Sequence, residues 1–213
     1  DQRGIDFISY DQYGYNYALL DQLFSTKPRT EFQRVILKAS AGDNYPFETD
    51  GSNQQWGNNA PLEGACHIRD QYVHTLSQRG GLNIDERTWE PCIVYANGQY
   101  WGVYDLREKV DDNDFLDYYY DQFEKYDSSI QYVQYLKTWG NTWIEYGGTP
   151  ALTDWNNLKN YILSNNMSNP ANFAYVDSLY NWKSLIDYFV LNSYVVTSDW
   201  LNWNTSWWRG LNP

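Results

Sequence analysis

The Asn97-Gly98 dipeptide is the feature that most restricts how this chain can fold. It follows the apolar run Cys92–Tyr95 and precedes Gln99–Arg107, in which apolar and polar residues alternate. Both central residues of a type I′ turn need a positive φ angle, which Asn and Gly adopt more readily than other residues. The segment therefore predicts a β-hairpin of two adjacent antiparallel strands.

Two further patterns precede this hairpin. Glu31–Ser40 alternates between two faces and predicts a strand. Cys66–Gln78 repeats its apolar residues at helical spacing and predicts a helix. Residues 41–61 are rich in Gly, Asn and Pro, so a long loop is expected between that strand and that helix.

The second half of the chain carries mainly helical patterns. They are Leu158–Ile162, Phe173–Leu179 and Trp182–Val196. Apolar residues surround most of the last segment, which predicts a buried helix. Strands with one helix first and helices afterwards favour an α+β fold of two lobes. The first lobe would comprise residues 1–110, and a helical second lobe would comprise residues 111–213.

Charge and composition narrow the function classes. The 213 residues carry a formal net charge of −12, which argues against binding to the phosphate backbone of nucleic acids. Hydrophobic residues make up 42% of the chain, but no run of about 18 apolar residues predicts a membrane span. The 21 Tyr and 11 Trp exceed what a core can hide, so some rings are expected on surfaces that suit sugars or proteins.

Three groups of residues could bind a metal or form a disulfide, and none has a diagnostic spacing. Five aspartates follow Lys109, and they are Asp111, Asp112, Asp114, Asp117 and Asp121. Their order lacks the glycine and terminal glutamate of a calcium loop, so a solvated acidic helix face is favoured. His67 and His74 lie seven residues apart, which favours packing over a metal pair. Cys66 and Cys92 could form a disulfide or remain buried thiols.

A candidate catalytic loop follows the last helical segment. Asp199 precedes Asn204 by five residues, with no Gly or Pro between them. This is the spacing of the protein-kinase catalytic loop, in which Asp orients or deprotonates the acceptor hydroxyl and Asn holds a metal ion. A plainer interpretation also fits, in which Asp199 caps a turn after the helix and Asn204 sits in a loop.

Three motifs in this order resemble those of a known family. They are RDQY at Arg69–Tyr72, NGQYWGVYDLREKVD at Asn97–Asp111 and SDWLNWN at Ser198–Asn204. The chain is similar in them to the CotH family, atypical protein kinases of the spore-coat type with many relatives among secreted bacterial proteins. The resemblance covers Phe32–Arg209. It implies a kinase-like fold that binds ATP and a divalent metal, Mg²⁺ or Mn²⁺, between two lobes.

The resemblance also implies roles for individual residues. Asp199 matches the catalytic-loop aspartate, and Asn204 matches the metal-binding asparagine. Lys38, at the end of its strand, is the candidate for the basic group that contacts the phosphates, with a plain strand-edge lysine as the alternative. On the next helix, Arg69 or Asp70 could pair with Lys38 or orient it.

Glu108 follows the hairpin, where a kinase-like chain passes from the first lobe to the second. It could contact the nucleotide ribose or close the hinge, and the hinge role is favoured. The chain also departs from the family. Members typically carry a W-D-x-D-x-[ST]-F-G-like segment after the SDW motif, which supplies a second metal-binding aspartate, and this chain ends at Pro213 ahead of it. A glycine-rich phosphate loop is lacking too.

These departures predict that the chain is a fragment of a larger protein. A kinase-like second lobe that stops after its catalytic loop would leave apolar surface exposed. The rest of the same protein or another subunit is expected to cover that surface.

The sequence leaves the function open between two main classes. One is a CotH-like kinase that transfers the γ-phosphate of ATP to Ser or Thr of a secreted or cell-surface bacterial protein. The other is a non-catalytic, kinase-shaped surface or adhesion module that binds polysaccharide or protein through exposed aromatic residues. A glycoside hydrolase is a third class, but no motif nominates its pair of carboxylates.

Overall fold

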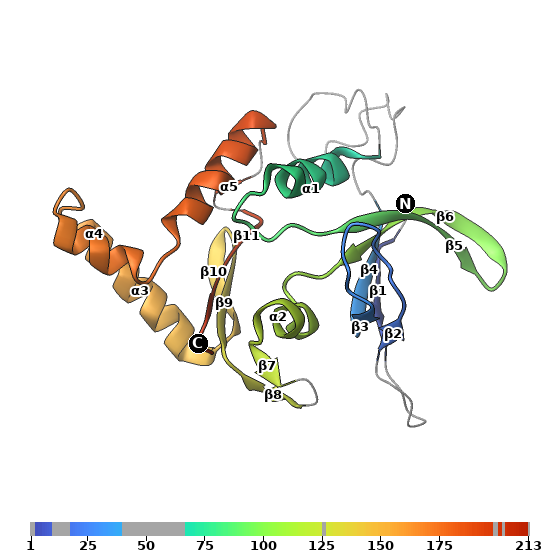
Figure 1. The fold of residues 1–213 in the computed structure, drawn as a ribbon, viewed down its shortest axis with the longest axis horizontal. Coiled ribbons are helices and arrows are strands. Elements are labelled where there is room, and N and C mark those ends of the chain that lie inside the picture. Colours follow the sequence, from blue (N-terminus) through green and yellow to red (C-terminus); the bar gives the residue numbers. More distant parts are fainter. Residues whose placement is uncertain are drawn as a thin grey trace. The chain divides into compact units, whose positions relative to one another are not determined.

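The computed structural model describes residues 3–9, 18–39, 67–124, 127–197, 200–201 and 203–212. These residues form a mixed α+β structure, as predicted, with contacts that divide the chain into two compact units (Figure 1). Unit 1 comprises Asp1–Gly81 and Asp85–Asp112, and unit 2 comprises Leu82–Ile84 and Asn113–Pro213. Within the described ranges, no helix has both the length and the apolar character that crossing a membrane requires.

Unit 1 is built on a four-stranded antiparallel sheet in the order β1-β4-β6-β5. Its elements are β1 (Ile5–Ile8), β2 (Leu19–Leu20), β3 (Glu31–Phe32), β4 (Arg34–Lys38), α1 (Arg69–Gly80), β5 (Trp89–Ala96) and β6 (Gln99–Glu108). β2 and β3 form a separate two-stranded pair. The strand predicted at Glu31–Ser40 is therefore split between two sheets, and the helix predicted from Cys66 is described from Arg69.

The β5–β6 hairpin confirms the prediction from the Asn-Gly dipeptide. Asn97 has a φ angle of 51° and Gly98 one of 77°, so both central residues are left-handed, as a type I′ turn requires. The hairpin extends away from the other strands of its sheet (Figure 1). On one of its faces Tyr104 is buried, whereas Ile93 and Val103, paired on the other face, are exposed.

A small aromatic cluster fills the space between this sheet and the β2–β3 pair. Phe24 and Phe32 pack edge to face at 5.3 Å, and both lie on Val35 of β4. Leu106 of β6 packs against the same cluster. The guanidinium of Arg29 lies 4.5 Å from the centre of the Phe32 ring, so a buried cation closes this core.

Unit 2 combines a three-stranded antiparallel sheet, in the order β10-β9-β11, with helices. Its elements are α2 (Asn113–Tyr120), β7 (Phe123–Glu124), β8 (Asp127–Gln131), β9 (Val133–Trp139), β10 (Asn141–Tyr146), α3 (Gly148–Ser164), α4 (Pro170–Asp177), α5 (Trp182–Tyr194) and β11 (Thr205–Gly210). α3 packs on the sheet, with Trp155 stacked on Trp207 at 5.3 Å. Beside this stack, Arg209 of β11 donates to Asp154 at 2.7 Å.

Two predictions about the second half of the chain are wrong. Strands do not end with the first half, because β9, β10 and β11 form the sheet of unit 2. The helix predicted as buried, α5, buries Leu191 but exposes more than half of Val190 and Tyr194. Apolar residues around a helix indicate burial only if other elements cover each of its faces.

Replacing Gly147 with alanine is expected to destabilise unit 2 by about 3 kcal/mol. Gly147 has a φ angle of 87°, and an added Cβ would lie 2.7 Å from the carbonyl oxygen of Val133 and 2.9 Å from Cα of Gln134. Backbone atoms cannot rotate away as a flexible side chain can. Urea denaturation measures the loss. The control is Gly148→Ala, at a φ angle of 58° with only Pro150 nearby at 3.7 Å, which should cost about 1 kcal/mol. Equal losses would contradict the steric argument.

Candidate functional site

Lys38 and Asp70 form an ion pair between the sheet and the helix of unit 1. Lys38 is the last residue of β4, and its Nζ donates to Oδ2 of Asp70 in the first turn of α1. Both side chains remain partly exposed. The prediction that a residue at the start of this helix pairs with Lys38 is confirmed for Asp70. Arg69 is exposed as the first residue of α1.

A buried guanidinium shares the carboxylate of Asp70. Nη1 of Arg107 lies 3.3 Å from Oδ2 of Asp70, and Nη2 lies 3.1 Å from Oδ2 of Asp105. The side-chain amide of Gln71 donates to the same oxygen of Asp105 and, at 2.9 Å, to the carbonyl of His67. Lys38 and Asp105 are directly paired across β4 and β6, so these groups share one face of the sheet.

Two neighbouring cations lower the pKa of Asp70 by more than its partial burial raises it. Burial raises the pKa of a carboxyl group because it disfavours the charged form. The ammonium of Lys38 and the guanidinium of Arg107 act in the opposite direction, and the net result lowers the pKa of Asp70 to about 2. Asp70 is therefore an anion throughout the physiological range and remains an ion-pair acceptor for both cations.

Acidification is expected to destabilise unit 1 through His74. Burial, followed by the charge of Arg107, lowers the pKa of His74 from 6.5 to about 4, and its Nδ1 accepts from the backbone N–H of Arg87 at 3.4 Å. The unfolded chain takes up a proton near pH 6.5, so stability present above that pH is lost as the pH falls toward 4. We expect the free energy of unfolding to fall by about 2 kcal/mol between pH 7 and pH 4.5. Urea denaturation at each pH should show most of this loss absent in His74→Gln, and an unchanged profile in that variant would rule out His74 as its source.

Glu108 lies in the core of unit 1. It is 1% exposed, its Arg29 partner is 2% exposed, and Nη1 of Arg29 lies 3.3 Å from Oε1 of Glu108. Removing either partner of a buried ion pair of this kind is strongly destabilising. The pair with Arg29 gives Glu108 a structural role within unit 1. Its two predicted roles, closure of the hinge and a contact with the nucleotide ribose, stay predictions.

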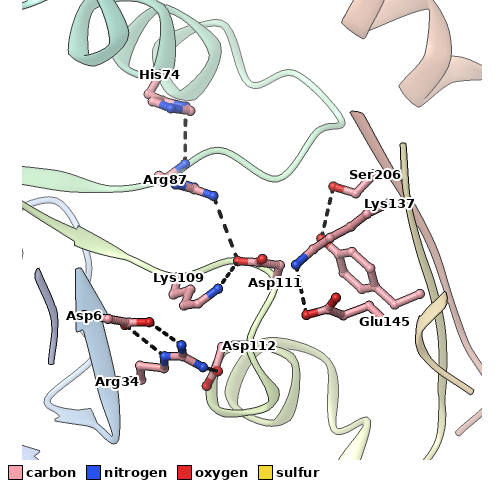
Figure 2. A network of polar contacts seen from close by, with 11 residues as sticks. Asp6, Arg34, His74, Arg87, Lys109, Asp111, Asp112, Lys137, Glu145 and Ser206 are labelled. Atoms are coloured by element: carbon pink, nitrogen blue, oxygen red, sulfur yellow. Dashed lines mark hydrogen bonds and ion pairs between the residues drawn. The ribbon is translucent and has the colours of Figure 1, made fainter. Parts of the chain in front are cut away.

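The interpretation of the aspartates after Lys109 as a solvated face is wrong for Asp111 and Asp112. Both are buried and precede α2 (Figure 2). Asp111 accepts from Lys109 at 2.9 Å, and Asp112 accepts from Arg34 at 2.7 Å. Arg34 also pairs with Asp6 of β1, so one guanidinium holds two carboxylates. These aspartates therefore fasten the end of the sheet in unit 1.

In unit 2, the two tryptophans of the motif Ser198–Asn204 pack on other elements of the same unit. Trp200 packs on α5, with its ring 5.9 Å from that of Tyr188 and 5.3 Å from that of Phe189. Trp203 packs edge to face on Trp139 of β9 at 5.0 Å. Aromatic contacts of this kind each contribute about 1 kcal/mol beyond the area they bury. Trp200 is therefore held to a helix, and Trp203 to a strand.

Asn204 is an exposed residue directly before β11, where Thr205 is buried. Its φ angle is 55°, a left-handed conformation that Asn tolerates better than most residues. Asp199 lies outside the described residues, so the structure gives no geometry for the predicted pair of Asp199 and Asn204. No three His, Cys, Asp or Glu side chains among those that are described lie together as a metal site.

Arg107 and Asp105 are the members of the site that the sequence did not nominate. Both belong to the hairpin motif Asn97–Asp111, to which the sequence assigns no role for either residue. The sequence did carry a signal for them. Asp105 and Arg107 are two residues apart, so they lie on the same face of a strand that otherwise carries mostly apolar residues. Charged residues on one face of a central strand need charged partners, and the first turn of α1 supplies one of them.

A comparison with protein families identifies the group to which the chain is related. The family described as CotH kinase protein matches residues 45–213, which is most of the chain. This chain belongs to the CotH kinase family. Lys38 precedes the matched residues, whereas Asp70, Arg107, Asp199 and Asn204 lie within them. No curated protein and no solved structure matches the chain.

Proposed function

We propose that this CotH family member is a protein kinase domain that transfers the γ-phosphate of ATP to Ser or Thr of a secreted or cell-surface protein. The ion pair between Lys38 and Asp70 carries the proposal. Protein kinases use a strand lysine paired with a carboxylate on the following helix to contact the phosphates of ATP. Lys38 would have this role here, with Arg69 as a second basic group at the start of the helix.

The remaining roles rest on the CotH resemblance and on general phosphoryl-transfer chemistry. Asp199 would orient or deprotonate the acceptor hydroxyl, and Asn204 would supply an oxygen ligand to Mg²⁺ or Mn²⁺. When bound, the metal would neutralise charge on the phosphates. The location of Asn204 directly before a buried strand residue supports a fixed ligand position.

Calorimetric titration of the full-length protein with ATP, with and without Mg²⁺ or Mn²⁺, tests this proposal. We expect metal-dependent binding that becomes about tenfold weaker in Lys38→Met, because one charge-assisted contact to phosphate is lost. Lys109→Met is the matched control, since Lys109 is a second lysine of unit 1 that pairs with Asp111. An intact protein that binds no nucleotide under any of these conditions rejects the kinase proposal.

The exposed hairpin favours a second candidate, a non-catalytic adhesion module. More than half of the side chains of Tyr95, Tyr100 and Trp101 is exposed, and the two tyrosine rings pack 6.0 Å apart. Rigid aromatic surfaces of this kind suit polysaccharide or protein partners. Binding to a polysaccharide that is lost in Trp101→Ala, in a protein without nucleotide affinity, would support this candidate over the kinase.

A further inference from the structure

Arg107 connects β6 to α1 through the same carboxylate that Lys38 uses. Its side chain is 1% exposed, and its two terminal nitrogens reach Asp70 at 3.3 Å and Asp105 at 3.1 Å. Asp70 thus has cationic partners on two neighbouring strands, Lys38 on β4 and Arg107 on β6. One of these partners can engage another group without leaving the carboxylate of Asp70 unpaired.

An arginine suits the contacts with Asp70 and Asp105 better than a lysine would. A guanidinium presents several N–H donors in a rigid fork, so it can bond two carboxylates at once, which a lysine ammonium does less well. Lys38 and Arg107 together balance the charges of Asp70 and Asp105. Without Arg107, Asp70 would keep the partly exposed Lys38, and Asp105 would lose the cation 3.1 Å away.

The start of α1 depends on these tertiary contacts. Its N-cap residue, Ile68, offers no side chain to the free backbone N–H groups. The buried residues of the helix are polar, Gln71 and Ser77, and Gln71 donates to the carboxylate of Asp105. Consecutive residues of the first turn, Asp70 and Gln71, are therefore tied to β6 by polar bonds.

We propose that Arg107 is a positioning residue, which holds Asp70 and the first turn of α1 on the sheet independently of Lys38. Lys38 can then turn from Asp70 to a nucleotide phosphate while the helix stays docked. The role assigned to Lys38 rests on the proposed kinase function. The docking of α1 by Arg107 does not, and the two can fail separately.

The titration of Asp70 tests the contact itself, without nucleotide. Carboxyl-carbon NMR should place the pKa of Asp70 about one unit higher in Arg107→Gln than in the wild type, because one of two cations is lost. Arg34→Gln is the matched control, since Arg34 also holds two carboxylates in unit 1 but does not touch Asp70. An unchanged pKa in folded Arg107→Gln overturns the proposal.

Amide hydrogen exchange tests the docking of α1. In Lys38→Met, exchange of the α1 amides should stay within about twofold of the wild type, whereas adding Arg107→Gln should accelerate it about tenfold or more. If variants with Arg107→Gln do not fold, Arg107→Lys serves as the test variant. A lysine keeps the positive charge but lacks the rigid fork of donors with which arginine bonds both carboxylates. We expect exchange of α1 to be about fivefold faster in Arg107→Lys and unaffected in Arg34→Lys.

The outcomes separate the two proposals. Loss of α1 protection in Lys38→Met alone, or full protection in the double variant, overturns the role of Arg107. If the wild-type protein does not bind ATP, the kinase function is rejected. The pKa of Asp70 and the hydrogen exchange of α1 still test the role of Arg107 in that case. If ATP does bind, Arg107→Gln should weaken its affinity about fivefold, and Arg107→Lys should restore part of it.

Discussion

Asp199→Asn is expected to reduce phosphoryl transfer to a protein substrate by about a thousandfold while ATP affinity stays within about twofold. Asparagine keeps the size of the side chain but cannot accept a proton from the acceptor hydroxyl. Transfer of radiolabelled γ-phosphate by the full-length protein measures the rate, and calorimetry measures the affinity. The separation of rate from affinity distinguishes a base from a residue that only binds ATP.

Two further variants are compared with Asp199→Asn, one at the proposed metal ligand and one as a control. Asn204→Ala should weaken metal-dependent ATP binding as well as transfer, because the proposed role of Asn204 is to hold the metal. Asp187→Asn is the control, since Asp187 is a partly exposed aspartate of α5 that accepts from Asn83 of the same unit. Normal transfer by Asp199→Asn would show that the D-x4-N spacing has no catalytic meaning here.

Arg29→Ala is expected to lower the free energy of unfolding of unit 1 by about 4 kcal/mol, the largest stability change that we predict. The substitution leaves the buried carboxylate of Glu108 without the cation 3.3 Å away and removes the contact with the Phe32 ring. Chemical denaturation measures the loss. Arg34→Ala breaks an exposed ion pair with Asp6 and a half-exposed one with the buried Asp112, so it should cost less, about 2 kcal/mol.

A double variant separates lost charge pairing from lost packing at Arg29. Arg29→Met with Glu108→Met removes both charges and keeps apolar volume, so it should recover much of the stability lost in Arg29→Ala. The same variant tests the nucleotide contact predicted for Glu108. If that contact exists, the folded double variant will bind ATP more weakly, and unchanged affinity would assign Glu108 to the fold alone.

Local signals in the sequence predicted the β5–β6 hairpin and, with different bounds, β4 and α1, but not β1 or β2. The Asn97-Gly98 turn and the alternating residues around it form a hairpin because neighbouring residues alone determine that conformation. The pairing of Lys38 with Asp70 was predicted from the family resemblance. Arg107 and Asp105 join this site because β4 pairs with β6, which places Asp105 directly opposite Lys38.

The sheet of unit 2 was missed because it depends on distant pairing. β9 pairs with β10 across the short turn at Gly140, but also with β11, which begins more than sixty residues later. The Gly140-Asn141 dipeptide between two runs rich in aromatic and β-branched residues was the signal that could have indicated the hairpin. α3 begins ten residues earlier than predicted, because Pro150 is tolerated in the first turn of a helix and is no evidence of a break there.

The contacts of Trp200 and Trp203 bear on how the family can vary. They tie one short loop to a helix and to a strand that lie about fifty residues apart in the chain. The connection between α3 and α5, which includes α4, can therefore change its length as long as α5 and β9 keep their contacts with the two tryptophans. A change of length there would leave Trp200 on α5 and Trp203 on β9, so neither contact depends on how long that connection is.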